Sequence, residues 1–192
     1  MESLFISTGL VALAEVGDKT QLLAFLLAAR FKKPVPIIAG ILLATLFNHG
    51  LAGALGAWIT STLSPELLRW ILGLSFMGMA IWTLIPDKIE EEETQIARRL
   101  GVFGATLITF FLAEMGDKTQ IATVALAAHY ASPVWVVAGT TLGMLIADVP
   151  AVFAGDKLAA RIPMRLVHTI AAAIFAALGA ATLLGAGAGL GL

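Results

Sequence analysis

Residues 13–21 read Leu-Ala-Glu-Val-Gly-Asp-Lys-Thr-Gln, and residues 112–120 read Leu-Ala-Glu-Met-Gly-Asp-Lys-Thr-Gln. The same offset of 99 positions makes 16 of 31 residues identical between 13–43 and 112–142, without a gap. An apolar composition alone does not reproduce a block with so many charged and polar matches. The chain therefore contains an internal duplication.

The composition is that of a membrane protein. Of 192 residues, 59% are hydrophobic and 13% are charged, whereas soluble domains carry about a quarter charged residues. This excludes a typical soluble enzyme and a disordered chain. A net charge of −1 lacks the clustered basic charge of a nucleic-acid binder, and the absence of cysteine excludes disulfides and thiolate metal sites. We expect an all-α polytopic protein whose surroundings are the lipid bilayer.

Six segments are long and apolar enough to be transmembrane helices, because a span needs roughly 20 residues. They are 3–29, 35–60, 67–85, 101–128, 133–154 and 166–187. This predicts a first three-helix repeat in 1–86, an acidic cytoplasmic linker in 87–100 that contains Glu90–Glu93, and a second three-helix repeat in 101–192. Three spans per repeat is an odd number, so the second repeat enters the bilayer from the opposite side. Such inverted repeats place a substrate site between the halves, near the midplane.

The lysines and arginines predict the orientation. Nine of them fall in loops on one side, namely Arg30, Lys32, Lys33, Lys88, Arg98, Arg99, Lys157, Arg161 and Arg165, and Arg69 is the basic residue on the other side. By the positive-inside rule, those loops face the cytoplasm and both termini face the periplasm. The residues after Met1 lack the basic segment of a signal peptide. We therefore expect a multi-pass protein of a bacterial inner membrane with no cleaved leader.

The motif places charge at membrane depth, where an ionisable residue costs roughly 3 kcal/mol or more unless it pairs or binds something. In a helix, the Glu and Asp of each copy lie on one face, with Gln near the same stripe. The intervening glycine allows a close backbone approach or an unwinding of the helix. Juxtaposing the copies gathers Glu15, Asp18, Glu114 and Asp117 around one cavity. Four carboxylates make a site for a hard cation such as Mn²⁺, Ca²⁺ or Mg²⁺.

Charge balance suggests what is exchanged. Each motif carries Glu, Asp and Lys, a net −1, so two motifs carry −2, which one divalent cation or two protons neutralise. Crowded carboxylates take up protons as a unit, and a metal would expel them. We expect exchange of one divalent cation for about two protons, with no prosthetic group.

Other polar positions are candidates for additional ligands or for groups that surround and orient the four carboxylates. The motif itself adds Lys19, Lys118, Thr20, Thr119, Gln21 and Gln120, and span two adds Asn48 and His49. Position 49 corresponds to Asp148, so both repeats carry an ionisable group there, which suggests a proton relay. An alternative interpretation is that Glu15–Lys19 and Glu114–Lys118 are i,i+4 ion pairs that lock helix packing. His129 and His168 receive no role.

The duplicated Glu-x-Gly-Asp-Lys-Thr block, with three spans per half and an acidic linker, resembles the Gdt-type cation:proton antiporter family. That family includes Golgi Mn²⁺/Ca²⁺ transporters and bacterial manganese exporters. The resemblance covers nearly the whole chain and implies Mn²⁺ export, with Ca²⁺ as a second substrate. The resemblance also implies that the acidic ligands are Glu15, Asp18, Glu114 and Asp117. The chain lacks the N-terminal extension of eukaryotic members, which favours a bacterial manganese exporter.

Three other functions compete with this interpretation. An intramembrane aspartyl protease would use Asp18 and Asp117, but Glu stands three residues before each Asp where such proteases have Gly. An exporter of another small solute fits the size, although a carboxylate-rich site is a poor receptor for anions and zwitterions. A non-transporting assembly subunit leaves the buried acids unexplained. The sequence does not distinguish Mn²⁺ from Ca²⁺ or indicate an oligomeric state.

Overall fold

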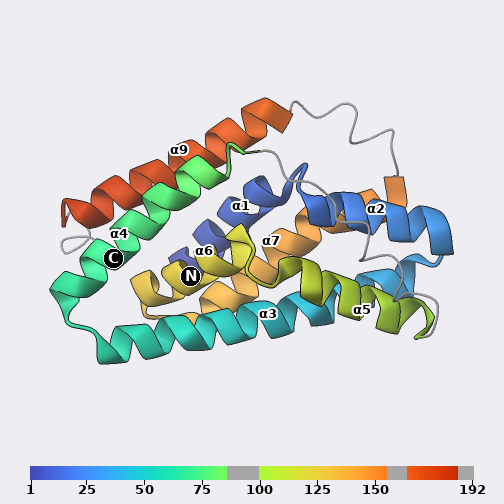
Figure 1. The fold of residues 1–192 in the computed structure, drawn as a ribbon, viewed down its shortest axis with the longest axis horizontal. Helices are drawn as coiled ribbons and strands as arrows, with labels where there is room; N and C mark the ends of the chain where they lie inside the picture. The colour runs from blue at the N-terminus through green and yellow to red at the C-terminus, as the bar shows by residue number, and fades with distance from the viewer. Residues whose placement is uncertain (86–99, 155–163, 186–192) are drawn as a thin grey trace.

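The computed structural model describes residues 1–85, 100–154 and 164–185. Within these ranges it is all-helical, with eight helices and no strand, as predicted for an all-α protein (Figure 1). The helices are α1 (Glu2–Glu15), α2 (Lys19–Phe31), α3 (Pro34–Thr62), α4 (Pro65–Trp82), α5 (Gly101–Glu114), α6 (Lys118–Tyr130), α7 (Pro133–Ala154) and α9 (Met164–Leu183). The acidic run Glu90–Glu93 and the basic residues Lys88, Arg98, Arg99, Lys157 and Arg161 lie outside the described residues.

Each copy of the motif interrupts a helix. Glu15 ends α1, Val16 is extended at φ −63° and ψ 114°, Gly17 has φ 85°, and Asp18 is the N-cap of α2. The second copy repeats these values, with Gly116 at φ 80°. The prediction of one continuous helix through 3–29 and another through 101–128 was wrong, and the alternative that the helix unwinds at glycine is confirmed. Glycine adopts a positive φ without steric penalty, and aspartate is a favoured N-cap.

The third predicted helix of each repeat is present as α4 and α9, and the second as α3 and α7. Proline begins α3, α4 and α7, where its missing N–H breaks no helical hydrogen bond. In the described residues, α3 and the Pro133–Phe153 part of α7 are each long and apolar enough to cross a bilayer. Gly101–Glu114 and His168–Leu183 are shorter apolar helices. Long apolar helices of this kind are expected of a membrane protein.

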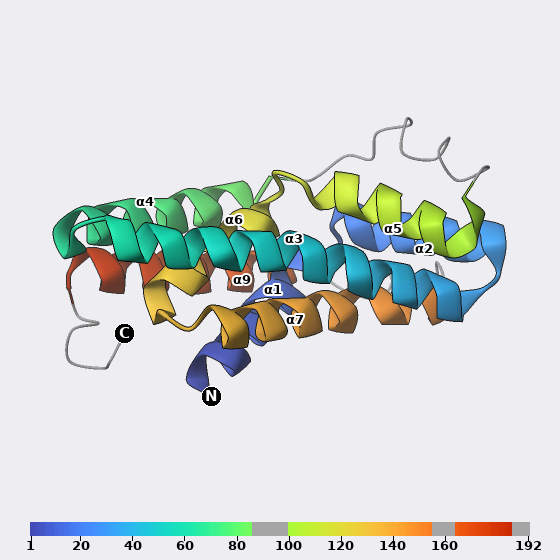
Figure 2. The ribbon, with the colours of Figure 1, turned by 90° about the horizontal axis from the view of Figure 1, so that it is seen from below.

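The two halves pack crosswise. Helix α1 of the first half packs against α7 of the second, and α5 of the second half packs against α3 of the first (Figure 2). A Cβ built on Gly40 would lie 2.7 Å from Thr106 Cβ, and one built on Gly139 would lie 3.0 Å from Ser7 Cβ. Both members of the first pair lie 99 positions from their counterparts in the second. The close contact between halves is therefore duplicated, as the sequence is.

Two apolar clusters lie on either side of the breaks. The first comes mainly from α1, α4, α6 and α9 and contains Leu10, Phe76, Leu126 and Phe175. The second comes from α2, α3, α5 and α7 and contains Leu23, Ile41, Phe110 and Val152. Helices α4 and α9 pack on each other and against α6 and α1, at one end of the molecule (Figures 1 and 2). Because each break joins a helix of one cluster to a helix of the other, the polar motif lies between the two apolar clusters.

Candidate metal centre

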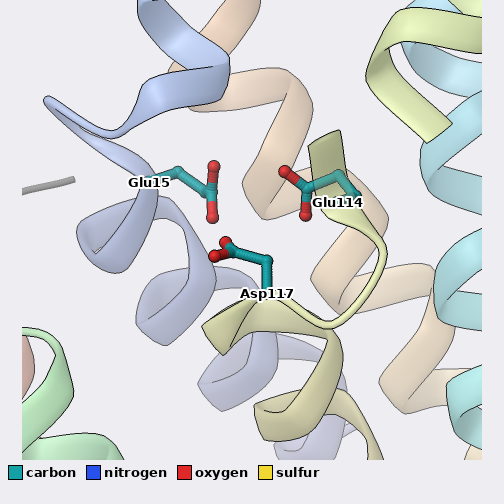
Figure 3. Close-up of side chains that lie close together, drawn as sticks. All are labelled: Glu15, Glu114 and Asp117. Carbon is teal, nitrogen blue, oxygen red and sulfur yellow. The ribbon is translucent and has the colours of Figure 1, made fainter. Parts of the chain in front are cut away.

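The two breaks bring three carboxylates together. One oxygen from each of Glu15, Glu114 and Asp117 lies within 4.8 Å of the other two, and all three side chains are buried (Figure 3). Residues 99 positions apart thus meet at one point, as the juxtaposition of the motifs predicted. Like charges this close in a buried place repel one another strongly unless a cation or protons join them.

Each glutamate is held by the threonine of its own motif. Thr20 Oγ1 donates to Glu15 Oε2 at 2.6 Å, and Thr119 Oγ1 donates to Glu114 Oε2 at 2.9 Å. The other oxygen of each glutamate, and Oδ2 of Asp117, are buried with no hydrogen-bond partner in the described part of the chain. Buried polar atoms normally have partners. These oxygens are therefore positioned as acceptors for a cation or a proton.

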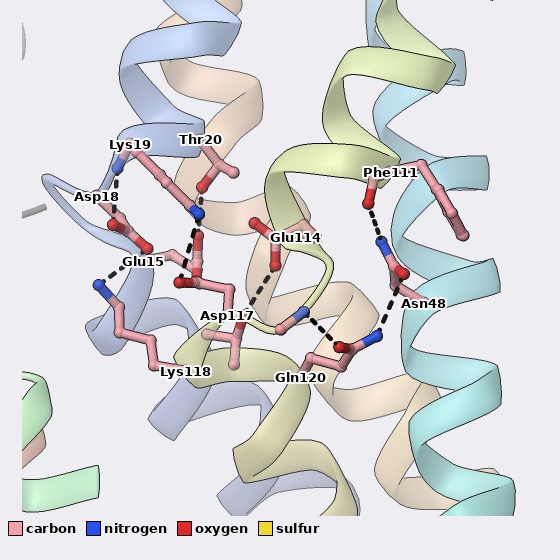
Figure 4. A network of polar contacts seen from close by, with 12 residues as sticks. Glu15, Asp18, Lys19, Thr20, Asn48, Phe111, Glu114, Asp117, Lys118 and Gln120 are labelled. Carbon is pink, nitrogen blue, oxygen red and sulfur yellow. Dashed lines mark hydrogen bonds and ion pairs between the residues drawn. The ribbon is translucent and has the colours of Figure 1, made fainter. Parts of the chain in front are cut away.

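The lysine of each motif forms an ion pair with the aspartate of the other motif. Lys118 Nζ lies 2.9 Å from Asp18 Oδ2, and Lys19 Nζ lies 3.7 Å from Asp117 Oδ1 (Figure 4). The alternative interpretation placed each lysine with the glutamate of its own motif, whereas these two pairs are with the aspartate of the other motif. The break separates glutamate from lysine, so helical spacing does not apply across it. The crossed pairs join the two repeats through their charges.

Asp18 has different surroundings from its counterpart Asp117. Its Oδ1 accepts from the backbone N–H of Lys19 at 2.7 Å, and its Oδ2 lies against Lys118. The cluster of three carboxylate oxygens comprises Glu15, Glu114 and Asp117 without it. The structure thus gathers three of the four predicted ligands and places the fourth in a buried ion pair beside them.

The glutamine of each motif hydrogen-bonds to the backbone of its own break. Gln21 Oε1 accepts from Gly17 N–H at 2.9 Å, and Gln120 Oε1 accepts from Gly116 N–H at 2.7 Å. Their amide groups reach matched positions, because Gln21 Nε2 donates to the Ala147 carbonyl and Gln120 Nε2 donates to Asn48 Oδ1. The glutamine oxygens that sequence suggested as extra ligands are thus used to shape the backbone.

The remaining supporting positions surround the cluster. Asn48, which accepts from Gln120, donates through its Nδ2 to the Phe111 carbonyl at 3.0 Å (Figure 4). Asp148 on α7 is completely buried, and neither of its oxygens has a hydrogen-bond partner among the described residues. The residue before it, Ala147, accepts from Gln21 Nε2 through its carbonyl, which places Asp148 near the first motif. His49 on α3 is completely buried as well.

One contact at the break was not anticipated. His168, on the first turns of α9, places Nε2 2.7 Å from the carbonyl oxygen of Val16, inside the first break. The sequence predicted no role for His168, which lies near a helix end and has Arg69 as its counterpart 99 positions earlier. A lone histidine near a helix start carries no signal of its own.

A helical membrane protein with carboxylates gathered between two duplicated, broken helices belongs to the class of ion transporters. The family model described as the divalent cation/proton antiporter GDT1 matches residues 3–91 and 102–189. The chain belongs to the GDT1 family, and the resemblance inferred from the motif is confirmed.

Curated relatives agree with this membership. A Vibrio cholerae protein named "Putative manganese exporter" is 53% identical over 183 residues, which cover 95% of this chain and 90% of that protein. A "GDT1-like protein 3" of Oryza sativa subsp. indica is 30% identical over 91% of this chain and 71% of its own. A GDT1-like protein of Synechocystis is 30% identical over 86% and 89% of the two chains. No solved structure matches.

Membership in this family decides between the competing functions. The chain is a cation transporter and not an enzyme, so the intramembrane aspartyl protease reading of Asp18 and Asp117 is wrong. The two aspartates lie in crossed ion pairs with Lys118 and Lys19.

Proposed function

We propose that this protein exports a divalent cation, Mn²⁺ first and Ca²⁺ second, in exchange for protons. The cluster of Glu15, Glu114 and Asp117 is the observation that carries the proposal. Three buried carboxylates, each with one oxygen lacking a hydrogen bond, match the hard oxygen ligands that Mn²⁺ and Ca²⁺ accept. The name of the Vibrio cholerae relative favours manganese.

Asp18 completes the ligand set in this proposal. Its Oδ2 lies against Lys118, and a cation entering the cluster would compete with the lysine for it. The two motifs carry four carboxylates and two lysines, a net −2 when all are ionised. One divalent cation balances that charge, as do two protons. Metal and protons therefore exclude each other, which is the requirement for exchange at a shared site.

Asp148 is our candidate for carrying protons to the cluster, with His49 at the matched position of the other half. Asp148 is completely buried and directly follows Ala147, whose carbonyl accepts from Gln21 of the first motif, and both its oxygens lack hydrogen-bond partners among the described residues. A carboxyl group in that position can accept a proton without being one of the three clustered ligands.

The proposal includes the membrane arrangement. Six spans form two inverted repeats, in which α1 with α2, and α5 with α6, each make one broken span. The basic loops lie in the cytoplasm and both termini lie in the periplasm of a bacterial inner membrane. Crosswise packing of α1 on α7 and of α5 on α3 supports this arrangement, because inverted repeats exchange equivalent contacts. Broken helices at the midplane are a common way for transporters to build an ion site.

The test is transport by purified protein in liposomes that contain a pH indicator and a Mn²⁺-sensitive dye. An imposed pH gradient should drive Mn²⁺ against its concentration gradient, and a Mn²⁺ gradient should move protons the other way. Mn²⁺ flux that neither moves protons nor responds to the pH gradient would reject exchange. Absence of both Mn²⁺ and Ca²⁺ flux would reject the substrate assignment.

A further inference from the structure

The first break leaves a backbone carbonyl that the helices do not use. Across this break, Asp18 N–H donates to the Glu15 carbonyl, and Leu22 N–H donates to the Asp18 carbonyl. The carbonyl of Val16 instead accepts from His168 of α9 at 2.7 Å. Because a carbonyl oxygen can only accept, Nε2 of His168 carries the proton. A side chain of the last helix thus holds the segment between two predicted ligands, Glu15 and Asp18.

The second break shows that the histidine is not needed to form this backbone. Its φ and ψ values match those of the first, with Met115 at −67° and 116°. Its threonine and glutamine make the same contacts as in the first break. However, the residue equivalent to His168 is Arg69, and Met115 is 54% exposed. The contact with α9 is therefore an addition to a break that its own motif already shapes.

We propose that His168 is a positioning residue that ties α9 to the ion site. It fixes the Val16 carbonyl, and with it the relative placement of Glu15 at the end of α1 and Asp18 at the start of α2. This inference rests on the proposed function. It adds α9 as a fifth helix at the ion site, because the carboxylates themselves come from the ends of α1, α2, α5 and α6.

The first consequence is kinetic. Loss of the contact should loosen the geometry of two ligands without removing either, which weakens ion binding more than turnover. In the liposome assay, we expect His168→Leu to raise the apparent KM for Mn²⁺ roughly ten-fold, the order seen when residues that orient a metal ligand are removed. Vmax should change less than about two-fold. His168→Gln, whose amide can donate from a similar position, should restore most of the KM.

The matched control is Thr169→Val. Thr169 is the next residue of α9, is exposed, and donates to the Arg165 carbonyl of its own helix. We expect wild-type KM for this variant. A wild-type KM in His168→Leu, or a raised KM that His168→Gln does not restore, would overturn the positioning role. Failure of the wild-type protein to transport either Mn²⁺ or Ca²⁺ would instead reject the proposed function, so the two failures are distinguishable.

A second measurement covers the case in which His168→Leu is too unstable to transport. The chain has no cysteine, so a single cysteine at position 16 or 115 can be labelled without background. We expect Val16→Cys to react with a maleimide several times faster in the His168→Leu background than in the His168→Gln background. Met115→Cys should react equally in both. Equal rates at position 16 would overturn the inference, and faster labelling at both positions would indicate general unfolding and reject a local role.

Discussion

Lys118 and Asp18 form an ion pair, Nζ to Oδ2 at 2.9 Å, in which both side chains are completely buried. The equivalent pair, Lys19 with Asp117, is longer at 3.7 Å, and its lysine side chain is 23% exposed. The sequence of the two motifs is the same at these positions, but the environments differ. The charged residues of the two motifs are therefore paired unequally.

This inequality predicts unequal effects of removing the lysines. Lys118→Met removes the lysine from a completely buried ion pair with Asp18, and breaking a buried pair costs about 3–5 kcal/mol. Lys19→Met removes a longer, partly exposed pair, for which we expect about 1 kcal/mol or less. Unfolding in mixed micelles, followed by the fluorescence of the tryptophans, measures both. Equal destabilisation by the two variants would contradict the difference in burial.

The clustered carboxylates predict a loss of ion binding without a loss of fold. Glu15→Gln, Glu114→Gln and Asp117→Asn each keep the size of the side chain and remove one negative charge from the cluster. We expect each to weaken Mn²⁺ binding at least about ten-fold, measured by titration of the purified protein. Glu66→Gln, at an exposed position in the first turn of α4, is the matched control and should bind as wild type does. Wild-type affinity in all three variants would remove the site assignment.

The threonine contacts predict a more selective effect. Thr20→Val removes the hydroxyl that donates to Glu15 Oε2 at 2.6 Å but keeps the shape of the side chain. A glutamate without this donor is less well oriented, so we expect Mn²⁺ affinity to fall roughly ten-fold. Thr20→Ser retains the hydroxyl and should remain near the wild-type affinity. If Thr20→Ser is as weak as Thr20→Val, then packing of the methyl group and not the hydrogen bond is responsible.

The sequence predicted the helical class, the duplication and the meeting of the two motifs, because each depends on patterns that the chain displays directly. Long apolar segments indicate helices, and a repeated acidic block at membrane depth requires a partner. The sequence also suggested that Gly17 and Gly116 permit unwinding. It did not decide between an unwound and a continuous helix, because an i,i+3 spacing of Glu and Asp suits a helix equally well.

The partners of the charged residues could not be read from spacing. Lys19 and Lys118 each pair with the aspartate of the other half, a choice that depends on how the halves pack. The same is true of Gln21, which contacts the Ala147 carbonyl across 126 positions. His168 was missed for a further reason. It binds a backbone carbonyl, and the sequence does not show which carbonyls a break exposes.

The glycine of the break predicts a backbone penalty. Gly17 has φ 85°, a region in which an L-residue with a side chain costs about 1–2 kcal/mol. Gly17→Ala should therefore destabilise the protein by that amount. Gly9→Ala is the matched control, because Gly9 lies within α1 with no atom within 4 Å of an added Cβ. It should be neutral or stabilise by up to about 1 kcal/mol. Equal effects in mixed-micelle unfolding would contradict the special conformation of the break.

Asp148 predicts that proton coupling and cation exchange can be separated. It is completely buried and follows Ala147, which Gln21 contacts, but it is not one of the three clustered carboxylates. Asp148→Asn keeps the shape and removes the protonatable group, so we expect Mn²⁺ transport driven by a pH gradient to fall more than about ten-fold. Exchange of Mn²⁺ for Mn²⁺ across the liposome membrane, which needs no proton movement, should persist, and Asp148→Glu should retain part of the coupled flux. Equal loss of both fluxes in Asp148→Asn would make Asp148 a ligand, and full coupled flux would show that protons reach the cluster by another path.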